Sequence, residues 1–243
     1  MGDDKGVRME SDSIDPVPRK SRSRDVAETV LVAATSAVPV LGGPFSVVLG
    51  NTLQGTYQRR LTMWLEDLGT ALDNLIAKVE GLEASELPQN EAFVDSALRA
   101  ARIAGSTANE EKLAALQAAV LNAALPSAPS EDLQQIFLTL VEDLTASHLR
   151  LLALLDDPPA YLDSLGIPWP DVLMGGHSGT VERVFPEWDR SFYDTLARDL
   201  HNRGLLASGS LHTSVSGHGL RQSQTTALGK QFLSFLRSPD HLG

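Results

Sequence analysis

The stretch PFSVVLGNTLQGTYQRRLTMWLEDLGTALDNLIAKV, residues 44–79, decides the fold class of this chain. Its apolar side chains return at steps of three and four residues, which is the spacing of one face of an α-helix. The opposite face carries charged residues such as Arg59, Glu66 and Lys78. The expected buried stripe is Phe45, Val48, Leu49, Thr52, Leu53, Leu61, Trp64, Leu65, Leu68, Leu72, Leu75, Ile76 and Val79. The pattern therefore predicts one long amphipathic helix and a mainly α protein.

The N-terminal part of this helix belongs to an uncharged run, residues 29–58, that contains SAVPVLGGPFSVVLG. Pro39, Gly42, Gly43 and Pro44 break the run, so it is typical of a helical hairpin. The hairpin is either a buried corner of a soluble domain or a segment that meets lipid. Each arm offers only about ten to fourteen apolar residues, whereas a span needs roughly twenty. The second arm also continues the amphipathic stripe, so we favour the buried corner.

Residues 1–24 are rich in Ser, Asp, Pro and Arg and contain almost no large apolar residue. They are predicted to be a disordered tail, because such a segment cannot bury enough surface to offset its ordering entropy. The tail opens with MGDDKGVRME, which lacks the pattern of a secretory signal and predicts a cytoplasmic protein, with membrane association as the alternative. The residues expected to contact a partner or a membrane are Arg22, Arg24, Val38, Leu41, Phe45, Val48, Leu49, Arg59 and Arg60.

The middle of the chain predicts three further helices, which complete a helical domain over residues 25–143. Asn90 precedes a helix with Phe93 and Ala97 on its buried face, and Thr107 with Glu110 has the spacing of a capping box. The small residues of LAALQAAVLNAAL, residues 113–125, favour close contact between helices. Ser130 then precedes a third helical pattern that runs to Leu144.

The pattern changes after Leu144, and residues 144–243 predict a winged-helix domain. A short helix ends at Pro158, a Pro/Gly-rich stretch covers residues 166–179, and another helix covers residues 189–203. GLLASGSLHTSVSGHGLRQSQTTALGKQFLSFL then predicts a short strand, a Ser/Gly/His hairpin and a last helix. Helix, helix, helix, two-stranded wing and helix is the order of that domain.

Composition narrows the classes of function. The chain has 243 residues, 42% of them hydrophobic, no cysteine and a net charge of −11. The absence of cysteine excludes disulfides and thiolate chemistry. The six histidines show no metal-ligand spacing, and GGHSGT around Ser178 is not a G-x-S-x-G nucleophile elbow. We therefore expect no enzyme activity, no cofactor and no metal.

Nucleic-acid binding by the winged helix is an alternative, for which the contact residues would be Arg190, Arg198, Arg203 and Arg221. The helix over residues 189–203 balances its arginines with Asp189, Asp194 and Asp199. Phosphate contacts need a surplus of positive charge. The charge balance therefore favours a protein partner over DNA.

Four parts of the chain together resemble the Abi-alpha type of bacterial abortive-infection protein. They are the Gly/Pro-broken apolar segment leading into a long helix, NEEKLAALQAAVLNAAL, FLTLVEDLTASHLRLLALL, and the closing LARDLHNRGLL with TTALGKQFLSFL. The apolar segment is longer here than in the family pattern, and none of these motifs is catalytic. The resemblance implies a cytoplasmic protein of phage defence that acts through partners or the membrane.

The sequence thus predicts a non-enzymatic interaction or regulatory protein of bacterial stress or phage defence that acts through a protein partner. A DNA-binding winged-helix regulator and a membrane-disrupting effector that uses the run over residues 29–58 are the alternatives. The sequence leaves the partner open, including a second copy of the same chain.

Overall fold

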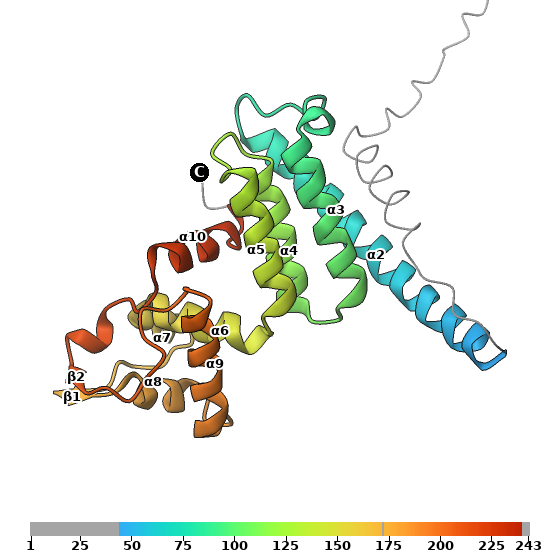
Figure 1. Ribbon diagram of the computed structural model, residues 1–243. Coiled ribbons are helices and arrows are strands. Elements are labelled where there is room, and N and C mark those ends of the chain that lie inside the picture. Colours follow the sequence, from blue (N-terminus) through green and yellow to red (C-terminus); the bar gives the residue numbers. More distant parts are fainter. Residues whose placement is uncertain (1–43, 172, 240–243) are drawn as a thin grey trace, which may run out of the picture.

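The computed structural model describes the backbone of residues 44–171 and 173–239, and the side chains of residues 54–171 and 173–239. Helices dominate this part of the chain, and its only sheet has two short strands (Figure 1). The mainly α prediction is therefore confirmed. The predicted tail over residues 1–24 and the first arm of the hairpin lie outside the described residues.

Helix α2, Pro44–Lys78, is the long helix that the opening stretch predicts. Leu61, Trp64, Leu65, Leu68, Leu72 and Leu75 are its buried residues. Its N-terminal half extends beyond the neighbouring helices (Figure 1). Tyr57 is the first of the described side chains of α2 that packs against the buried core.

The other helices of the N-terminal bundle are α3, Glu91–Ser106, α4, Glu110–Ala123, and α5, Glu131–Asp143, with the short turn η1, Leu87–Gln89. Helices α3 and α4 form the centre of the bundle, because each contacts α2, α5 and the other. Asn90 caps α3 by accepting the Phe93 N–H, as predicted. The cap of α4 differs from the prediction, because Asn109 and not Thr107 accepts the Lys112 N–H. The helix therefore begins two residues later than the Thr107 capping box would place it.

Small residues bring the bundle helices close together. Ala97, Ala100, Ala101 and Ala104 are buried on α3, and similar alanines line α4. The ring of Tyr57 occupies the position where a Cβ of Gly105 would lie. The contact between α2 and α3 thus depends on the missing side chain of Gly105.

The C-terminal region holds α6, Ala146–Asp156, α7, Pro158–Ser164, α8, His177–Val184, α9, Arg190–Asn202, and α10, Ala227–Phe235. Helix α10 contacts both α4 and α6, so it joins this region to the bundle. Phe137 of α5 lies 5.6 Å from the ring of Phe232 and 5.5 Å from that of Phe235, between ring centres. The buried core is consequently continuous across the domain boundary predicted at residue 143.

The strand pairing differs from the predicted hairpin. Strand β1, Met174–Gly175, pairs antiparallel with β2, Val215–Ser216, which is followed by the short turn η2, Gly219–Arg221. A separate antiparallel bridge joins Leu206 to Thr225. One partner of the sheet therefore comes from the Pro/Gly-rich stretch before α8. Two-residue strands carry no readable alternation, which is why the pattern did not predict this pairing.

Candidate protein-docking surface

The sequence-predicted contact residues of the N-terminal region are only partly described. Arg22, Arg24, Val38 and Leu41 lie outside the described residues. The backbone of Phe45, Val48 and Leu49 is part of α2, but the described side chains begin at residue 54. Arg59 is exposed and Arg60 is half-buried, both on α2.

Three of the four arginines proposed for DNA contact have partners within the chain. Arg203 binds the carboxylates of Asp143 at 3.0 Å and Asp199 at 3.1 Å. The guanidinium of Arg221 lies 4.8 Å from the ring centre of Trp169. Arg190 is 3.8 Å from Asp194, and Arg198 is exposed. Arg190, Arg203 and Arg221 thus already contact other groups of the chain.

A groove of ≈ 530 Å³ lies where α4, α6, α7 and α10 meet, and we name it the junction groove. Its apolar surface comes from both halves of the chain: Ala115, Ala118, Leu121, Ala153, Leu233 and Leu236. Small residues on α4 and α6 leave room for another backbone to approach closely. The groove exists only because α10 packs back onto the bundle.

Ion pairs neutralise the charged residues that line this groove. The Nε of Arg150 donates to both carboxylate oxygens of Glu111 at 2.9 Å. These hydrogen bonds raise the pKa of the Arg150 guanidinium above its usual value. Arg237 donates to Asp156 at 3.0 Å. A ligand in the groove therefore meets an apolar floor with paired charges beside it.

A row of four aromatic side chains starts at the groove, and we name it the aromatic ladder. Tyr161 lines the groove and meets Phe185 edge-on at 6.2 Å between ring centres. Phe185 stacks on Trp188 at 3.9 Å, and Trp188 meets Phe192 edge-on at 5.5 Å. Phe192 is 40% exposed. Partly exposed Tyr and Trp side chains are the types that contribute most to protein interfaces.

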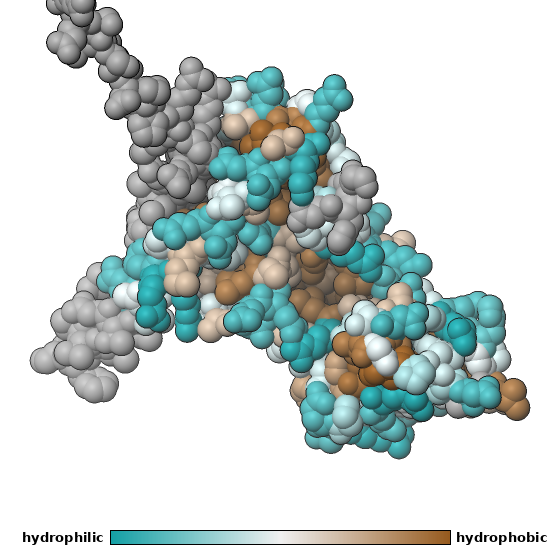
Figure 2. All heavy atoms as spheres, turned by 180° about the vertical axis from the view of Figure 1, so that it is seen from behind, coloured by the Kyte–Doolittle hydropathy of each residue, from teal (hydrophilic) through white to brown (hydrophobic). Residues whose placement is uncertain are grey.

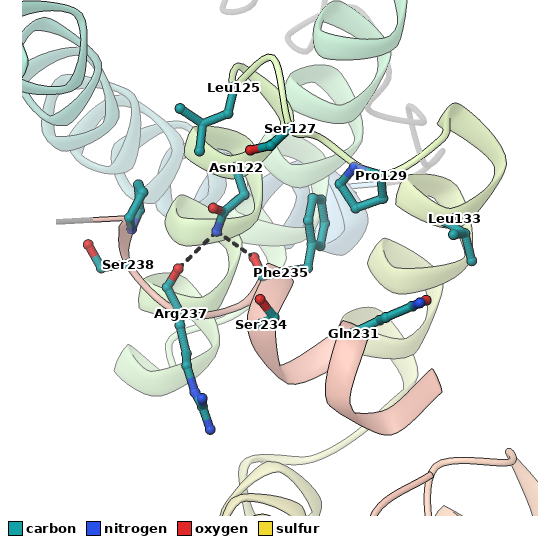
Figure 3. Close-up of a pocket in the computed structure, with 11 residues that line it drawn as sticks. Asn122, Leu125, Ser127, Pro129, Leu133, Gln231, Ser234, Phe235, Arg237 and Ser238 are labelled. Atoms are coloured by element: carbon teal, nitrogen blue, oxygen red, sulfur yellow. Dashed lines mark hydrogen bonds between the residues drawn. The ribbon is translucent and has the colours of Figure 1, made fainter. Parts of the chain in front are cut away.

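A second cavity, of ≈ 630 Å³, lies on the other side of the end of α10 (Figure 3). Asn122 lines this cavity, and its side-chain amide donates to the backbone carbonyls of Phe235 at 3.0 Å and Arg237 at 2.8 Å. Ser127, Ser234 and Gln231 supply the other polar groups among its lining residues. The amide of Asn122 thus fastens α10 to α4, which is a structural role.

One group of side chains has the composition of a nucleophilic relay. Thr145 Oγ1 lies 2.8 Å from His148 Nδ1, and His148 Nε2 lies 3.4 Å from an Asp199 oxygen. However, His148 Nδ1 also accepts the Thr145 backbone N–H at 3.2 Å, and the Thr145 side chain accepts the His148 N–H. Burial lowers the pKa of His148, and this effect is larger than the increase that the nearby charge of Asp199 produces. The capping box of α6 therefore accounts for this geometry.

Two further buried groups stand out near α8. The hydroxyl of Tyr193 donates to Glu182 at 2.7 Å, and burial together with this bond raises its pKa to about 12. Both ring nitrogens of His177 are buried without a partner in the described structure. Within the part of the chain that the structure describes, no three acidic or histidine side chains gather as a metal site. Nor does any helix there combine the length and apolar character needed to cross a bilayer.

In comparisons with known proteins, the chain matches no family model, no curated protein and no solved structure. The resemblance to the Abi-alpha type therefore stays a prediction from sequence. The junction groove and the aromatic ladder are site features that sequence reasoning missed. The signal for the ladder is FPEWDRSF, residues 185–192, which holds three aromatic residues in eight positions.

Proposed function

We propose that this chain is a non-enzymatic interaction protein that docks a protein partner on the junction groove and the aromatic ladder. The observation that carries the proposal is their connection: Tyr161 belongs to both, and the buried Phe185 links it to the partly exposed rings of Trp188 and Phe192. Apolar grooves of this kind accept the apolar face of a helix, and aromatic side chains beside them act as anchors.

The resemblance to the Abi-alpha type supports a role in bacterial phage defence or stress regulation, in the cytoplasm. That type of protein acts without a catalytic signature, which agrees with the capping role of Thr145 and His148. We further propose that residues 144–243 form a winged-helix domain used for protein docking, and that residues 29–58 form the Gly/Pro-broken hairpin.

The proposal is tested by placing a photo-crosslinking amino acid in the full-length protein in its own cells. Gln117, at the groove, and Phe192, at the end of the ladder, are the test positions. Thr70, exposed on α2, is the matched control. We expect covalent protein adducts from both test positions and none from Thr70. Absence of adducts at both test positions contradicts the proposal.

A DNA-binding regulator is the second candidate function. The order of elements in the C-terminal region favours DNA binding. Helices α8 and α9 lie in the chain between β1 and the strand residues around Leu206 and β2. A helix placed in this way can present its outer face to a groove of DNA. In a mobility-shift assay with the full chain at low salt, Arg198→Ala should abolish binding if this function holds. Arg203 is unsuitable for the test, because it also joins α5 to α9.

The third candidate, a membrane-disrupting effector, would use the uncharged run over residues 29–58. Its support is the length of the run and the basic residues Arg24 and Arg59 on either side. Flotation with anionic liposomes tests it: full-length protein that floats, and a Val48→Asp variant that does not, would favour this function over docking.

A further inference from the structure

His148 lies in the first turn of α6, where the chain passes from the bundle to the C-terminal half. Its Nδ1 accepts the backbone N–H of Thr145 at 3.2 Å, and the hydroxyl oxygen of Thr145 lies 2.8 Å from the same nitrogen. In return, the Thr145 side chain accepts the His148 backbone N–H. The side chain of His148 is only 12% exposed. The two residues therefore cap the start of α6 from a largely buried position.

This cap requires a neutral imidazole ring. A ring nitrogen accepts a hydrogen bond only while it carries no proton, and both nitrogens of the imidazolium are donors. Because Nδ1 of His148 accepts the Thr145 N–H, the proton of the neutral ring is on Nε2. A proton on Nδ1 would place two N–H groups against each other and leave the Thr145 N–H without this acceptor. Glutamine, which is common at this position of a capping box, has no such dependence on pH.

The charged groups around the ring come from α9 and from the end of α5. Nε2 of His148 faces an oxygen of Asp199 at 3.4 Å, and Arg203 binds the same carboxylate at 3.1 Å. Arg203 also binds Asp143 at 3.0 Å. Burial opposes the imidazolium most strongly and Arg203 adds to this effect, whereas Asp199 favours the charge. The balance keeps the pKa of His148 below its usual value, so the capped ring is neutral at neutral pH.

The turn that this cap holds also forms part of the junction groove. Leu149 and Arg150, which follow His148 directly, both line the groove. The Leu149 N–H donates to the Thr145 carbonyl at 3.3 Å, and Arg150 binds Glu111 of α4. Loss of the cap therefore loosens the turn that carries this wall of the groove.

From these contacts we propose that His148 is a pH-sensitive switch for the junction groove: its neutral ring caps α6 and holds the groove in its docking form, and its protonation releases the cap. The proposal rests on the proposed docking function of the groove and adds its regulation. A ring that has left the cap takes up a proton near pH 6.5, the ordinary value for histidine, before the capped ring does. Docking should consequently weaken as the pH falls below about 6.5.

Amide hydrogen exchange of the full chain, measured by NMR between about pH 7.5 and 5, tests the switch without a partner. The reporters are the N–H groups of Thr145 and Leu149, each corrected for the intrinsic effect of pH on exchange. We expect their protection to fall by about 5-fold or more, the effect of losing a cap. In His148→Gln the protection should stay constant, because the glutamine oxygen accepts at every pH. Protection that changes equally in both proteins, or in neither, overturns the proposal.

Two further variants separate titration of the ring from a purely structural role. His148→Ala removes the acceptor, so protection should be low already at neutral pH and should not fall further. His201→Gln is the matched control, because Nδ1 of His201 lies 2.9 Å from the Leu206 carbonyl, an acceptor to which a protonated ring still donates. It should keep the pH response of the unchanged protein. Loss of the response in His201→Gln, or a full response in His148→Ala, overturns the proposal.

The photo-crosslinker at Gln117 connects the switch to docking. In lysates of its own cells, we expect fewer partner adducts at about pH 5.5 than at about pH 7.5, and we expect His148→Gln to remove this difference. Adducts that do not depend on pH overturn the proposed switch and leave the docking function standing. No adduct at either pH contradicts the docking function and, with it, the switch.

Discussion

The two halves of the molecule achieve stability by different means. In the bundle, residues 54–143, most buried side chains are alanine and leucine, and a buried polar contact joins Ser96 to Gln134 at 2.8 Å. The C-terminal half, residues 144–239, buries Tyr193, His177 and Thr225. Its loops are fastened by single hydrogen bonds, such as that from Thr225 Oγ1 to Asp156 at 2.7 Å. The bundle should therefore be sensitive to volume, and the C-terminal half also to charge and pH.

The surface where the two halves meet differs in hydropathy from the surface around it. Figure 2 shows apolar side chains gathered in the hollow between the two halves, with hydrophilic residues around them. The junction between the halves is therefore apolar, and the largest predicted effect lies in its core.

Removal of the Phe137 ring should produce the largest loss of stability. Phe137 is fully buried and contacts Phe232 and Phe235 of α10. Phe137→Ala should lower the free energy of unfolding by about 3–5 kcal/mol, because it leaves a cavity between the halves. Ile136→Ala, on the next residue and 46% exposed, is the control and should change stability far less. Denaturant unfolding measures both. A loss below about 1 kcal/mol for Phe137→Ala would contradict a shared core.

Gly229→Ala should give the second largest effect. Gly229 lies in the first turn of α10, and an added Cβ would collide with the backbone carbonyl of Leu205. We expect a loss of about 1–3 kcal/mol, since backbone cannot yield as a flexible side chain does. Gly179→Ala is the matched control, because that helical position in α8 has open space and should gain up to about 1 kcal/mol. Thermal unfolding of the two variants should move in opposite directions.

His177 should make the C-terminal half sensitive to acid. Burial lowers the pKa of His177 below its usual value, so the unfolded chain takes up a proton first as the pH falls. Stability should consequently fall below about pH 6.5, by up to about 1.4 kcal/mol per pH unit. His177→Phe should remove this part of the pH dependence. His148, whose pKa is also lowered by burial, is present in both proteins and cancels in the difference. Identical curves for the two proteins between pH 8 and 5 would show that His177 is not the cause.

The bundle could be predicted from sequence because its information is local and periodic. The apolar stripe of α2 and the side-chain cap of α3 by Asn90 are properties of neighbouring residues. The Thr107 cap failed because Asn109 offers a side-chain acceptor closer to the helix, a choice that spacing alone does not settle.

The C-terminal details could not be predicted in the same way. Strand β1 is paired with residues about forty positions away, and its two residues show no alternation. The junction groove combines α4 with α10, more than a hundred residues apart, whereas the small residues of α4 by themselves predict only close contact between helices. Of these alanines, Ala115 and Ala118 are buried and yet line the groove. A pattern within one helix cannot reveal a surface that two distant helices form together.

The smallest predicted effect concerns the ion pairs of Arg203 between the halves. Arg203 joins Asp143, at the end of α5, to Asp199 of α9, and all three side chains are partly exposed. Exposed pairs contribute little, because water screens them and ordering the side chains costs entropy. Arg203→Gln should therefore lower the free energy of unfolding by less than about 1 kcal/mol, and the difference should shrink in 1 M salt. Arg198→Gln, on an exposed residue of the same helix, is the control and should have almost no effect. A loss as large as that of Phe137→Ala, unchanged by salt, would mean that charge and not the aromatic core holds the two halves together.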